Sequence, residues 1–600
     1  MFRRLFKSVR EYKTAAILTP IFVSLEVVME CLIPFIIAML VNAIDVDTAA
    51  GETVELNQVL MYGGILIAMS FASLAFGALS GAFCAKASSG FVKNLRQDMF
   101  YKVQDFSFEN IDKFSTSSLV TRMTTDTNNV QMAFMMIIRI AVRCPLMMIF
   151  SLVMAFVMGG SLGWIFVAVI PVLSAILLLI MKAAMPLFHR VFKKYDNLNE
   201  SIQENIRGMR VVKSYVREDY EKKKFDRAAT DVQIDFTKAE RILAWNNPVM
   251  QFFFYGVLSA VLFIGSYLIL KSSGATVKVA EVSQLIVYGM QILTSLMMLS
   301  MVFAMIVMSV ESARRVCEVL DEKSTLVSPE NAVKEIADGS IDFNGVNFKY
   351  AREAERFALE GVDLHIKSGE TIGIIGGTGS SKTTLVNLIS RLYDVTEGSV
   401  MVGGRDVREY DLVSLRDSVS VVLQKNELFS GTIKQNLRWG DPNATDEQLI
   451  EACKLAQADE FIQSFPNGYD TFIEQGGTNV SGGQKQRLCI ARALLKKPKI
   501  LILDDSTSAV DTKTDALIRK GFREYIPETT KIIIAQRTSS VEDADRIIVM
   551  DGGKINAIGT HDELLGKNQI YTEVFTTQNR KDNDAVMDAI ASKGGGHARS

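Results

Sequence analysis

The sequence predicts a membrane α-helical domain of six transmembrane helices, followed by a soluble α/β domain. The first half of the chain contains six apolar stretches, and each has the ~20 residues that a helix needs to cross a bilayer. They lie at 15–42, 58–85, 131–158, 164–187, 246–270 and 285–308. From Ser340 onward, short β-like runs alternate with amphipathic helices, which is typical of an α/β domain. A chain of 600 residues also exceeds what one hydrophobic core usually supports.

The polar segments between these stretches give the expected domain boundaries. Phe2, Leu5, Phe6 and Val9 share one helical face, which predicts either an interfacial helix or a frayed basic N-terminus. Helical periodicity continues the spans into long polar extensions at 86–130 and 188–243. The expected parts are an interfacial helix (1–14), the six-helix membrane domain (15–308), a linker (309–340), the α/β domain (341–576) and a polar tail (577–600) with the composition of a disordered segment.

The distribution of charge predicts the orientation in the membrane. Lys and Arg are concentrated in 1–14, 86–130 and 188–243, whereas the loop 43–57 is acidic and the loop 159–163 is uncharged. The positive-inside rule therefore places both termini in the cytoplasm, and we expect a bacterial cytoplasmic membrane. A net charge of −2 indicates no nucleic-acid partner. The six scattered Cys argue against a zinc site or a disulfide framework.

A glycine-rich loop between a short apolar strand and an apolar-periodic helix predicts a P-loop. The strand is Thr371–Ile375, and the loop runs from Gly376 to Thr383. Backbone N–H groups of such a loop bind phosphate oxygens, Lys382 reaches the β- and γ-phosphates, and Thr383 can hold Mg²⁺. Ser381 stands where the consensus loop has Gly, and its Cβ is expected to crowd the loop without preventing binding.

A second apolar strand, Leu501–Asp504, ends in a carboxylate that can position Mg²⁺. An α/β core without a nucleotide site would not require acidic residues at the end of that strand. Together with the P-loop, this strand predicts ATP and Mg²⁺ as cofactors.

Further motifs resemble those of ABC transporters. Ser481–Gln484 resembles the signature motif, Gln424 the Q-loop, Tyr350 the aromatic residue that stacks on adenine, and Ser508–Asp511 the D-loop. The spans and extensions resemble type I ABC exporters, so the resemblance covers about residues 1–576. It implies coupling helices near 106–116 and 208–220, and two nucleotide domains that sandwich ATP between one P-loop and the other signature motif. The implied nucleotide-binding set is Tyr350, Gly376, Gly377, Thr378, Gly379, Ser380, Ser381, Lys382, Thr383, Thr384, Ser481, Gly482, Gly483 and Gln484; the Mg²⁺ set is Thr383, Gln424 and Asp504; the catalytic set is Asp505, Gln536, Gln424 and Asp511.

Two departures from the family pattern affect the site that uses this chain's own P-loop. Asp505 stands where the family carries a catalytic Glu, and Gln536 where it carries a His. Asp is one methylene shorter than Glu, and Gln cannot carry a proton as His can. Because Ser481–Gln484 is intact, the pattern resembles one half of heterodimeric bacterial multidrug exporters. The partner is then a homologous chain with Glu and His, and the cargo is amphipathic or drug-like.

Other functions remain open at this point. A homodimer in which Asp505 still acts as base, a lipid or peptide exporter, and an ATP-gated regulatory or channel-like protein fit the same motifs. Transport in vesicles compared with electrical recording would separate an exporter from a channel.

Ionisable residues within the predicted spans are costly and are seldom unpaired. Glu26 and Glu30 lie one turn apart in the first span, and Arg139 and Arg143 lie one turn apart in the third. We expect a Glu26–Arg143 ion pair or a cluster of all four residues, which acts as a structural clamp or lines the translocation route.

The last span is rich in Met at helical spacing. Flexible, polarizable side chains suit a cavity that accepts many shapes, although ordinary helix packing explains any single Met equally well. The candidate cavity residues are Met297, Met301, Met305 and Phe253.

Overall fold

The computed structural model describes residues 1–49, 56–272, 277–351, 354–506 and 508–578. They fold as two compact units. The first comprises Met1–Asp105 and Phe114–Glu322, and the second comprises Phe106–Lys113 together with the chain from Lys323 onward.

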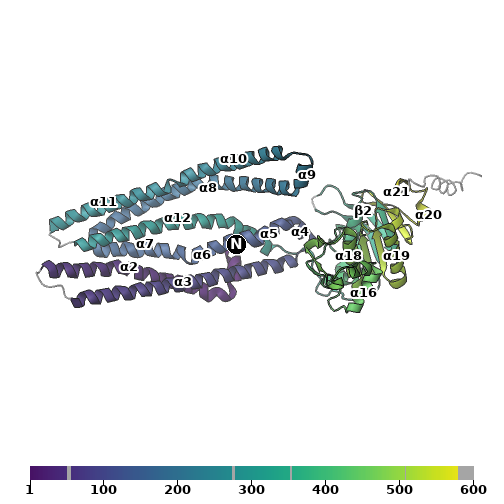
Figure 1. Ribbon diagram of the computed structural model, residues 1–600, viewed down its shortest axis with the longest axis horizontal. Helices are drawn as coiled ribbons and strands as arrows, with labels where there is room; N and C mark the ends of the chain where they lie inside the picture. Colours follow the sequence, from purple (N-terminus) through teal and green to yellow (C-terminus); the bar gives the residue numbers. More distant parts are fainter. Residues whose placement is uncertain (50–55, 273–276, 352–353, 507, 579–600) are drawn as a thin grey trace, which may run out of the picture. The chain divides into compact units, whose positions relative to one another are not determined.

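The first unit is a bundle of long helices that run back and forth side by side (Figure 1). Apolar runs form the predicted spans within these helices, and polar segments with helical periodicity extend them, as in the second half of α8 and in α10. The elements are α1 Phe2–Leu5, η1 Phe6–Tyr12, α2 Lys13–Ala49, α3 Leu56–Gln104, α4 Phe108–Phe114 (largely assigned to the second unit), α5 Thr116–Thr121, η2 Arg122–Asp126, α6 Thr127–Ile138, α7 Ile140–Gly159, η3 Gly160–Leu162, α8 Gly163–Arg207, α9 Met209–Ser214, α10 Glu218–Leu243, α11 Asn246–Ser272 and α12 Val279–Asp321.

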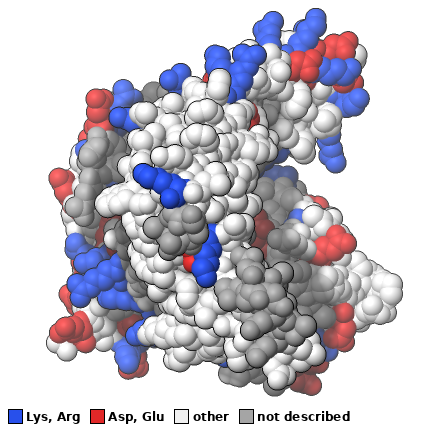
Figure 2. Space-filling model, turned by 90° about the vertical axis from the view of Figure 1, so that its left-hand side faces the viewer, with Lys and Arg blue, Asp and Glu red and all other residues white. Residues whose placement is uncertain are grey.

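Each of the six apolar stretches lies in helix. The described residues contain five continuous helical stretches that are long and apolar enough to cross a membrane. The third stretch, Thr116–Arg207, contains two of the predicted spans. The turn η3 divides them, beginning at Gly160 with a φ of 51° that favours glycine. Figure 2 looks onto the left-hand end of the view in Figure 1, and most of the described surface there carries uncharged side chains.

The structure differs from the expected boundaries at both ends of this unit. Residues 2–12, expected as an interfacial helix or a frayed N-terminus, form two short elements, α1 and η1, with a break at Arg10 (φ 41°, ψ −118°). Leu5 and Val9 are buried, whereas Phe6 is 52% exposed. At the other end, α12 continues to Asp321, inside the range expected as linker. The short helices α4 and α9 lie within the two regions expected as coupling helices.

The second unit is built on a six-stranded sheet in the order β12-β11-β3-β10-β9-β6, with parallel pairing except between β11 and β12. A four-stranded antiparallel sheet, β2-β1-β4-β5, and a small β7-β8 pair complete the strands. The elements are β1 Ile341–Phe348, β2 Leu359–Ile366, β3 Thr371–Gly376, α13 Lys382–Ile389, β4 Glu397–Val402, β5 Arg405–Asp406, η4 Val407–Glu409, α14 Leu412–Ser418, β6 Val419–Val422, β7 Gly431–Thr432, α15 Ile433–Leu437, α16 Asp446–Leu455, α17 Asp459–Gln463, η5 Gly468–Asp470, β8 Phe472–Ile473, η6 Gln475–Gly477, α18 Gly482–Leu495, β9 Ile500–Asp504, α19 Thr512–Tyr525, β10 Thr530–Ile534, η7 Thr538–Ser540, β11 Arg546–Asp551, β12 Lys554–Gly559, α20 His561–Leu564 and α21 Gln569–Gln578.

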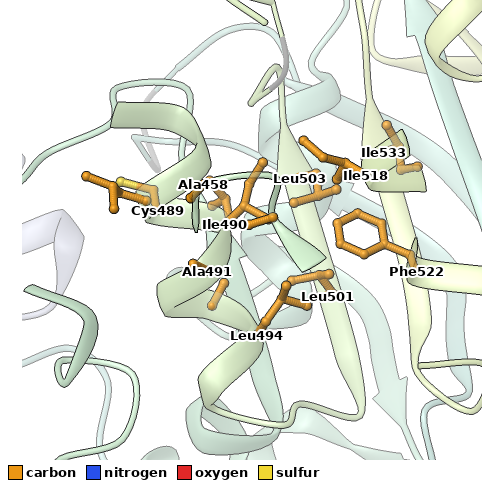
Figure 3. Packing of buried hydrophobic residues seen from close by; sticks show 14 of the residues in the cluster. Ala458, Cys489, Ile490, Ala491, Leu494, Leu501, Leu503, Ile518, Phe522 and Ile533 are labelled. Atoms are coloured by element: carbon orange, nitrogen blue, oxygen red, sulfur yellow. The ribbon is translucent and has the colours of Figure 1, made fainter. Parts of the chain in front are cut away.

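Buried aliphatic side chains fix the central strands against the helices that cover them. Leu501 and Leu503 of β9 and Ile533 of β10 belong to one core cluster with Ile490 of α18 and Phe522 of α19 (Figure 3). Strands buried on both faces read as continuous apolar runs, as these do. Because β3, β9 and β10 are parallel neighbours, their carboxyl ends meet at one edge, where ligands bind in such sheets.

Candidate functional site

The loop between β3 and α13 forms an open cradle. Lys382 Nζ donates hydrogen bonds to the carbonyl oxygens of Gly376 (2.9 Å) and Gly377 (2.8 Å). A Cβ at Gly377 or Gly379 would meet nothing within 4 Å, whereas one at Gly376 would lie 2.2 Å from the Met550 carbonyl oxygen. The loop thus has room for phosphate oxygens on one side and packs against β11 on the other. Ser380 and Thr384 also line this cavity, as do Thr378 and Thr383.

Ser381 has a left-handed backbone conformation, with a φ of 68°. Glycine adopts this conformation without the steric cost that a Cβ imposes. The consequence of the missing consensus Gly is therefore backbone strain in the loop immediately before Lys382.

The oxygen atoms that would hold a magnesium ion lie together beneath the loop. Thr383 Oγ1 donates to Asp504 Oδ2 at 2.9 Å, and Asp504 is only 3% exposed. Burial raises the pKa of Asp504, and the charge of Asp505 adds to this, while the hydrogen bond from Thr383 opposes it. Burial likewise lowers the pKa of Lys382. Hydroxyl and carboxylate oxygens suit Mg²⁺, which keeps several waters and substrate oxygens as ligands. Gln424 lines the same cavity.

Asp505 and Gln536 are in direct contact at the edge of this cavity. Gln536 Nε2 donates to Asp505 Oδ2 at 2.8 Å. Asp505 has a φ of 50°, and its N–H donates to the Ile534 carbonyl oxygen at 3.0 Å. Burial raises the pKa of Asp505, whereas hydrogen bonds from Gln424 and Gln536 lower it. Both departures from the family pattern therefore belong to one hydrogen-bonded group.

The helix α21, the last one in the described part of the chain, supplies residues that the motifs did not reveal. Glu573, Val574, Thr577 and Gln578 line the nucleotide cavity. Gln578 Nε2 donates to the Gln536 carbonyl oxygen at 2.7 Å, and Gln578 Oε1 accepts from the Thr538 N–H at 2.9 Å. No sequence signal marks Gln578, because α21 is an ordinary amphipathic segment.

The signature motif forms the N-terminus of α18. Ser481 Oγ accepts from the Gln484 N–H at 3.3 Å, and Gln484 Oε1 accepts from the Ser481 N–H at 2.9 Å, which is a capping box. Gln486 accepts from the Ala509 N–H at 3.0 Å, so the helix holds the segment that leads to Asp511, which caps α19. The residues Ser481–Gln484 do not line the cavity formed by this chain's P-loop.

Tyr350 is half exposed and lies next to the first turn of α13. Its hydroxyl is 2.8 Å from Thr384 Oγ1, and its ring packs edge-to-face on Tyr393 with centroids 5.2 Å apart. Tyr393 in turn donates from its hydroxyl to Asp112 Oδ2 of α4 at 2.8 Å. The residue expected to stack on adenine is thus one aromatic contact away from a region expected as a coupling helix.

In the first unit, Arg143 of α7 pairs with two carboxylates of α2. Arg143 Nη1 lies 2.5 Å from Glu26 Oε1, and Nη2 lies 2.7 Å from Glu30 Oε2. Glu26 is also 3.5 Å from the Ser80 hydroxyl of α3. The structure does not place Arg139 in this cluster, since it forms no ion pair with either Glu in the described part of the chain.

The Met-rich face of α12 differs from the expected cavity. Among the described residues, a cavity between α6–α7 and α12 is lined by Met290 and Met298 of α12, and not by Met297, Met301 or Met305. Phe253 packs instead against the cluster that contains Leu173 and Leu293. Helical rotation explains the difference, because residues at adjacent positions of a helix face directions ~100° apart.

Comparison with known proteins agrees with both units. The model of the ABC transporter transmembrane region matches residues 16–299, and the ABC transporter model matches residues 359–508. The chain is 34% identical over 569 residues to the uncharacterized ABC transporter ATP-binding protein YfiB of Bacillus subtilis, covering 95% of this chain and 97% of that one. It is 36% identical to the putative multidrug export ATP-binding/permease protein YgaD of Bacillus subtilis, covering 63% and 65%.

The fold is also that of a solved structure. A bacterial Atm1-family ABC exporter with ATP bound superposes with a TM-score of 0.81 at 23% identity, covering 95% of this chain and 98% of that one. The predicted fold class, a helical membrane domain followed by an α/β nucleotide-binding domain, is confirmed. The chain therefore belongs to the ABC transporter family: it is a multi-pass membrane protein with the type I exporter fold, whose ATP-binding domain couples ATP to transport.

Proposed function

We propose that this chain is one half of a heterodimeric exporter that moves amphipathic, drug-like or lipophilic compounds across the bacterial cytoplasmic membrane. Its own P-loop site holds ATP with Mg²⁺ and hydrolyses it slowly. Its signature motif completes the site on a homologous partner chain, which carries Glu and His. The contact between Gln536 and Asp505 is the observation that supports this division.

The geometry around Asp505 is unsuited to fast hydrolysis. A general base must reach the attacking water, and a displacement of ~1 Å can cost on the order of 100-fold in rate. The Asp505 side chain is a methylene shorter than Glu, and one of its oxygens accepts a hydrogen bond from Gln536 at 2.8 Å. An amide cannot exchange a proton with the reacting group as an imidazole can. The site keeps the groups that bind nucleotide and lacks those that activate water.

The signature motif shows none of this degeneration. The capped N-terminus of α18, a helix of 14 residues, presents backbone N–H groups that favour a phosphate. The residues Ser481–Gln484 are not among the residues that line this chain's own nucleotide cavity, which supports the proposal that they bind the phosphate held by the partner chain.

Several features support a cytoplasmic nucleotide-binding domain and transport out of the cell. Positive charge in 1–14, 86–130 and 188–243 favours cytoplasmic termini. The contact of Tyr393 with Asp112 gives α4 a direct link to the α/β domain, as a coupling helix needs. The relative YgaD bears the description of a putative multidrug exporter, which favours drug-like cargo.

Everted membrane vesicles test the proposal. Vesicles would contain this chain with a homologous half-transporter that carries Glu and His, or either chain alone, and would be given ATP and one cationic, one neutral and one anionic fluorescent dye. We expect ATP-dependent accumulation of at least one dye only with both chains. Equal accumulation by this chain alone would indicate a homodimer, and ion conductance without accumulation would indicate a channel.

A further inference from the structure

A cavity in the first unit combines an apolar lining with positive charge. It has a volume of about 440 Å³, within the range of ~300–1,000 Å³ typical of small-molecule sites. It is lined by Met135, Arg139, Ile140, Arg143, Cys144, Met147, Met290, Gln291, Thr294, Ser295 and Met298.

The charges around this cavity are arranged asymmetrically. Its lining contains two arginines and no carboxylate. Glu26 and Glu30 of α2 contact Arg143 and neutralise its charge, but they do not line the cavity. Within the cavity, guanidinium groups and neutral polar groups therefore face the space that a ligand would fill.

Arg139 differs from Arg143 in having no acceptor among the described residues. In the chain as described, no hydrogen bond or ion pair of the Arg139 side chain is found, whereas Arg143 bonds both Glu26 and Glu30. Arg139 lies at the break between α6 and α7 (φ −116°, ψ −66°), and its guanidinium lies over Gly81, where a Cβ would be 3.6 Å from one terminal nitrogen. A guanidinium carries five donors, and leaving them unmet at membrane depth is costly.

The apolar part of the lining suits the body of an amphipathic molecule. Met135, Met147, Met290 and Met298 come from three helices, and Met side chains adapt to varied shapes. Met290 and Met298 are 48% and 46% exposed, so they remain available for contact.

We propose that Arg139 anchors an amphipathic organic anion, such as a carboxylate or sulfonate on an apolar body, in this cavity. The planar guanidinium binds the anionic group through two parallel hydrogen bonds. The thioethers contact the apolar body. The inference rests on the proposed export function for the identity of the bound molecule as cargo.

Binding to the full-length chain in phosphatidylcholine nanodiscs tests this site without ATP or transport. The probes are pyrene-butyrate, an anion, and pyrene-butanol, its neutral counterpart. Arg139→Gln removes the guanidinium that would bind the anion, whereas Arg139→Lys keeps the positive charge and loses the two parallel hydrogen-bond donors. Lys182→Gln removes an exposed positive charge of α8 outside the cavity. Size-exclusion chromatography and ATP binding confirm that each variant is folded.

We expect the wild type to prefer the anion and Arg139→Gln to weaken its binding about 10-fold or more, as for a lost charge-assisted pair. Arg139→Lys should restore part of this loss, Lys182→Gln should behave as wild type, and binding of the alcohol should change less than about 2-fold in every variant. Equal losses for both probes, or no loss for the anion, would overturn the proposal. Loss of the anion preference when a partner chain is added would also overturn the proposal, because it would assign Arg139 to a carboxylate of that partner. Loss of the preference when phosphatidylglycerol is added would overturn it as well, because it would assign Arg139 to a lipid headgroup. Intact anion preference without dye export in vesicles would leave the site standing and contradict the export function alone.

Discussion

At the residue scale, a few atoms decide what the nucleotide site can do. Lys382, Thr383 and Asp504 keep the groups that bind phosphate and a divalent cation, and they lie within hydrogen-bond distance of the loop or of one another. Asp505 and Gln536 form a hydrogen bond with each other. Under the proposed function, Asp505 lacks the reach of a Glu, and Gln536 cannot transfer a proton as a His can. Under the proposed function, binding and catalysis are therefore separable in this site, because different residues supply them.

Ser381→Gly should relieve the left-handed strain of the P-loop. A Cβ in this conformation costs about 1–2 kcal/mol relative to glycine, so the variant should be more stable by about 1 kcal/mol and bind ATP at least as tightly. Lys497→Gly is the matched control, since Lys497 has a similar φ of 48° but lies outside the nucleotide cavity. Thermal unfolding with and without ATP separates the two effects. A less stable Ser381→Gly variant would show that the serine hydroxyl, not strain, dominates at this position.

Arg143 of the membrane cluster and Arg139, which lies outside it, should respond differently to neutral substitution. Arg143→Gln leaves Glu26 and Glu30 facing each other without their cation, and breaking a buried pair typically costs about 3–5 kcal/mol. Arg139→Gln removes a charge with no carboxylate partner in the described chain and should cost much less. Thermal unfolding in detergent compares them, and an equal loss for both would contradict the structural clamp at Arg143.

At the element scale, the parallel strands β3, β9 and β10 bring the loops of the site together, and α21 closes it from outside. The Gln578 side chain donates a hydrogen bond to the Gln536 carbonyl oxygen and accepts one from the Thr538 N–H, so it holds the backbone of the segment that carries Gln536. This helix is thus part of the nucleotide site, although it carries no recognised motif.

Gln578→Ala should loosen the segment around Gln536. Two hydrogen bonds to backbone groups are lost, each worth about 0.5–1.5 kcal/mol, so ATP affinity should fall several-fold. Thr576→Ala is the control, because the Thr576 hydroxyl bonds only carbonyl oxygens of its own helix, Thr572 at 2.8 Å and Glu573 at 3.2 Å. Titration with a fluorescent ATP analogue measures both, and identical affinities would exclude a role for α21 in holding this segment.

The sequence allowed the helices of the membrane domain and the nucleotide motifs to be predicted, because each depends on local information. Apolar length defines a span, and the P-loop is a contiguous motif within a strand–loop–helix unit. Contacts between distant segments were harder to predict. Nothing local indicates that Gln578 bonds Gln536 or that a break at Arg139 separates α6 from α7. The charges within the spans predicted either one ion pair or a cluster of four residues, and the sequence does not choose between these and the observed pairing of Arg143 with both Glu26 and Glu30. The Met residues that line the cavity depend on how α12 is rotated, which its spacing alone does not fix.

At the scale of the whole molecule, the proposed function gives different roles to the chain's two half-sites. Its P-loop half has Asp505 and Gln536 in place of Glu and His, and its signature half is intact and capped at Ser481. Two copies of this chain would form two identical sites, each with Asp505 and Gln536, which under the proposed function hydrolyse ATP slowly. A partner with Glu and His would instead give one site that retains ATP and one that hydrolyses it.

The ATPase rate of two variants in the assembled pair tests this division of labour most directly. Asp505→Asn changes only this chain's own site, whereas Gly482→Asp places a carboxylate where the partner's phosphate would bind. Gly482 is exposed, a Cβ there meets only Ala509 Cβ at 3.5 Å, and an acidic residue in the first turn of α18 favours the helix, so the fold should tolerate the change. We predict a rate within about 2-fold of wild type for Asp505→Asn and a loss of at least about 100-fold for Gly482→Asp, the scale expected when one transition-state contact is removed. A severe loss for Asp505→Asn with a normal rate for Gly482→Asp would contradict the account.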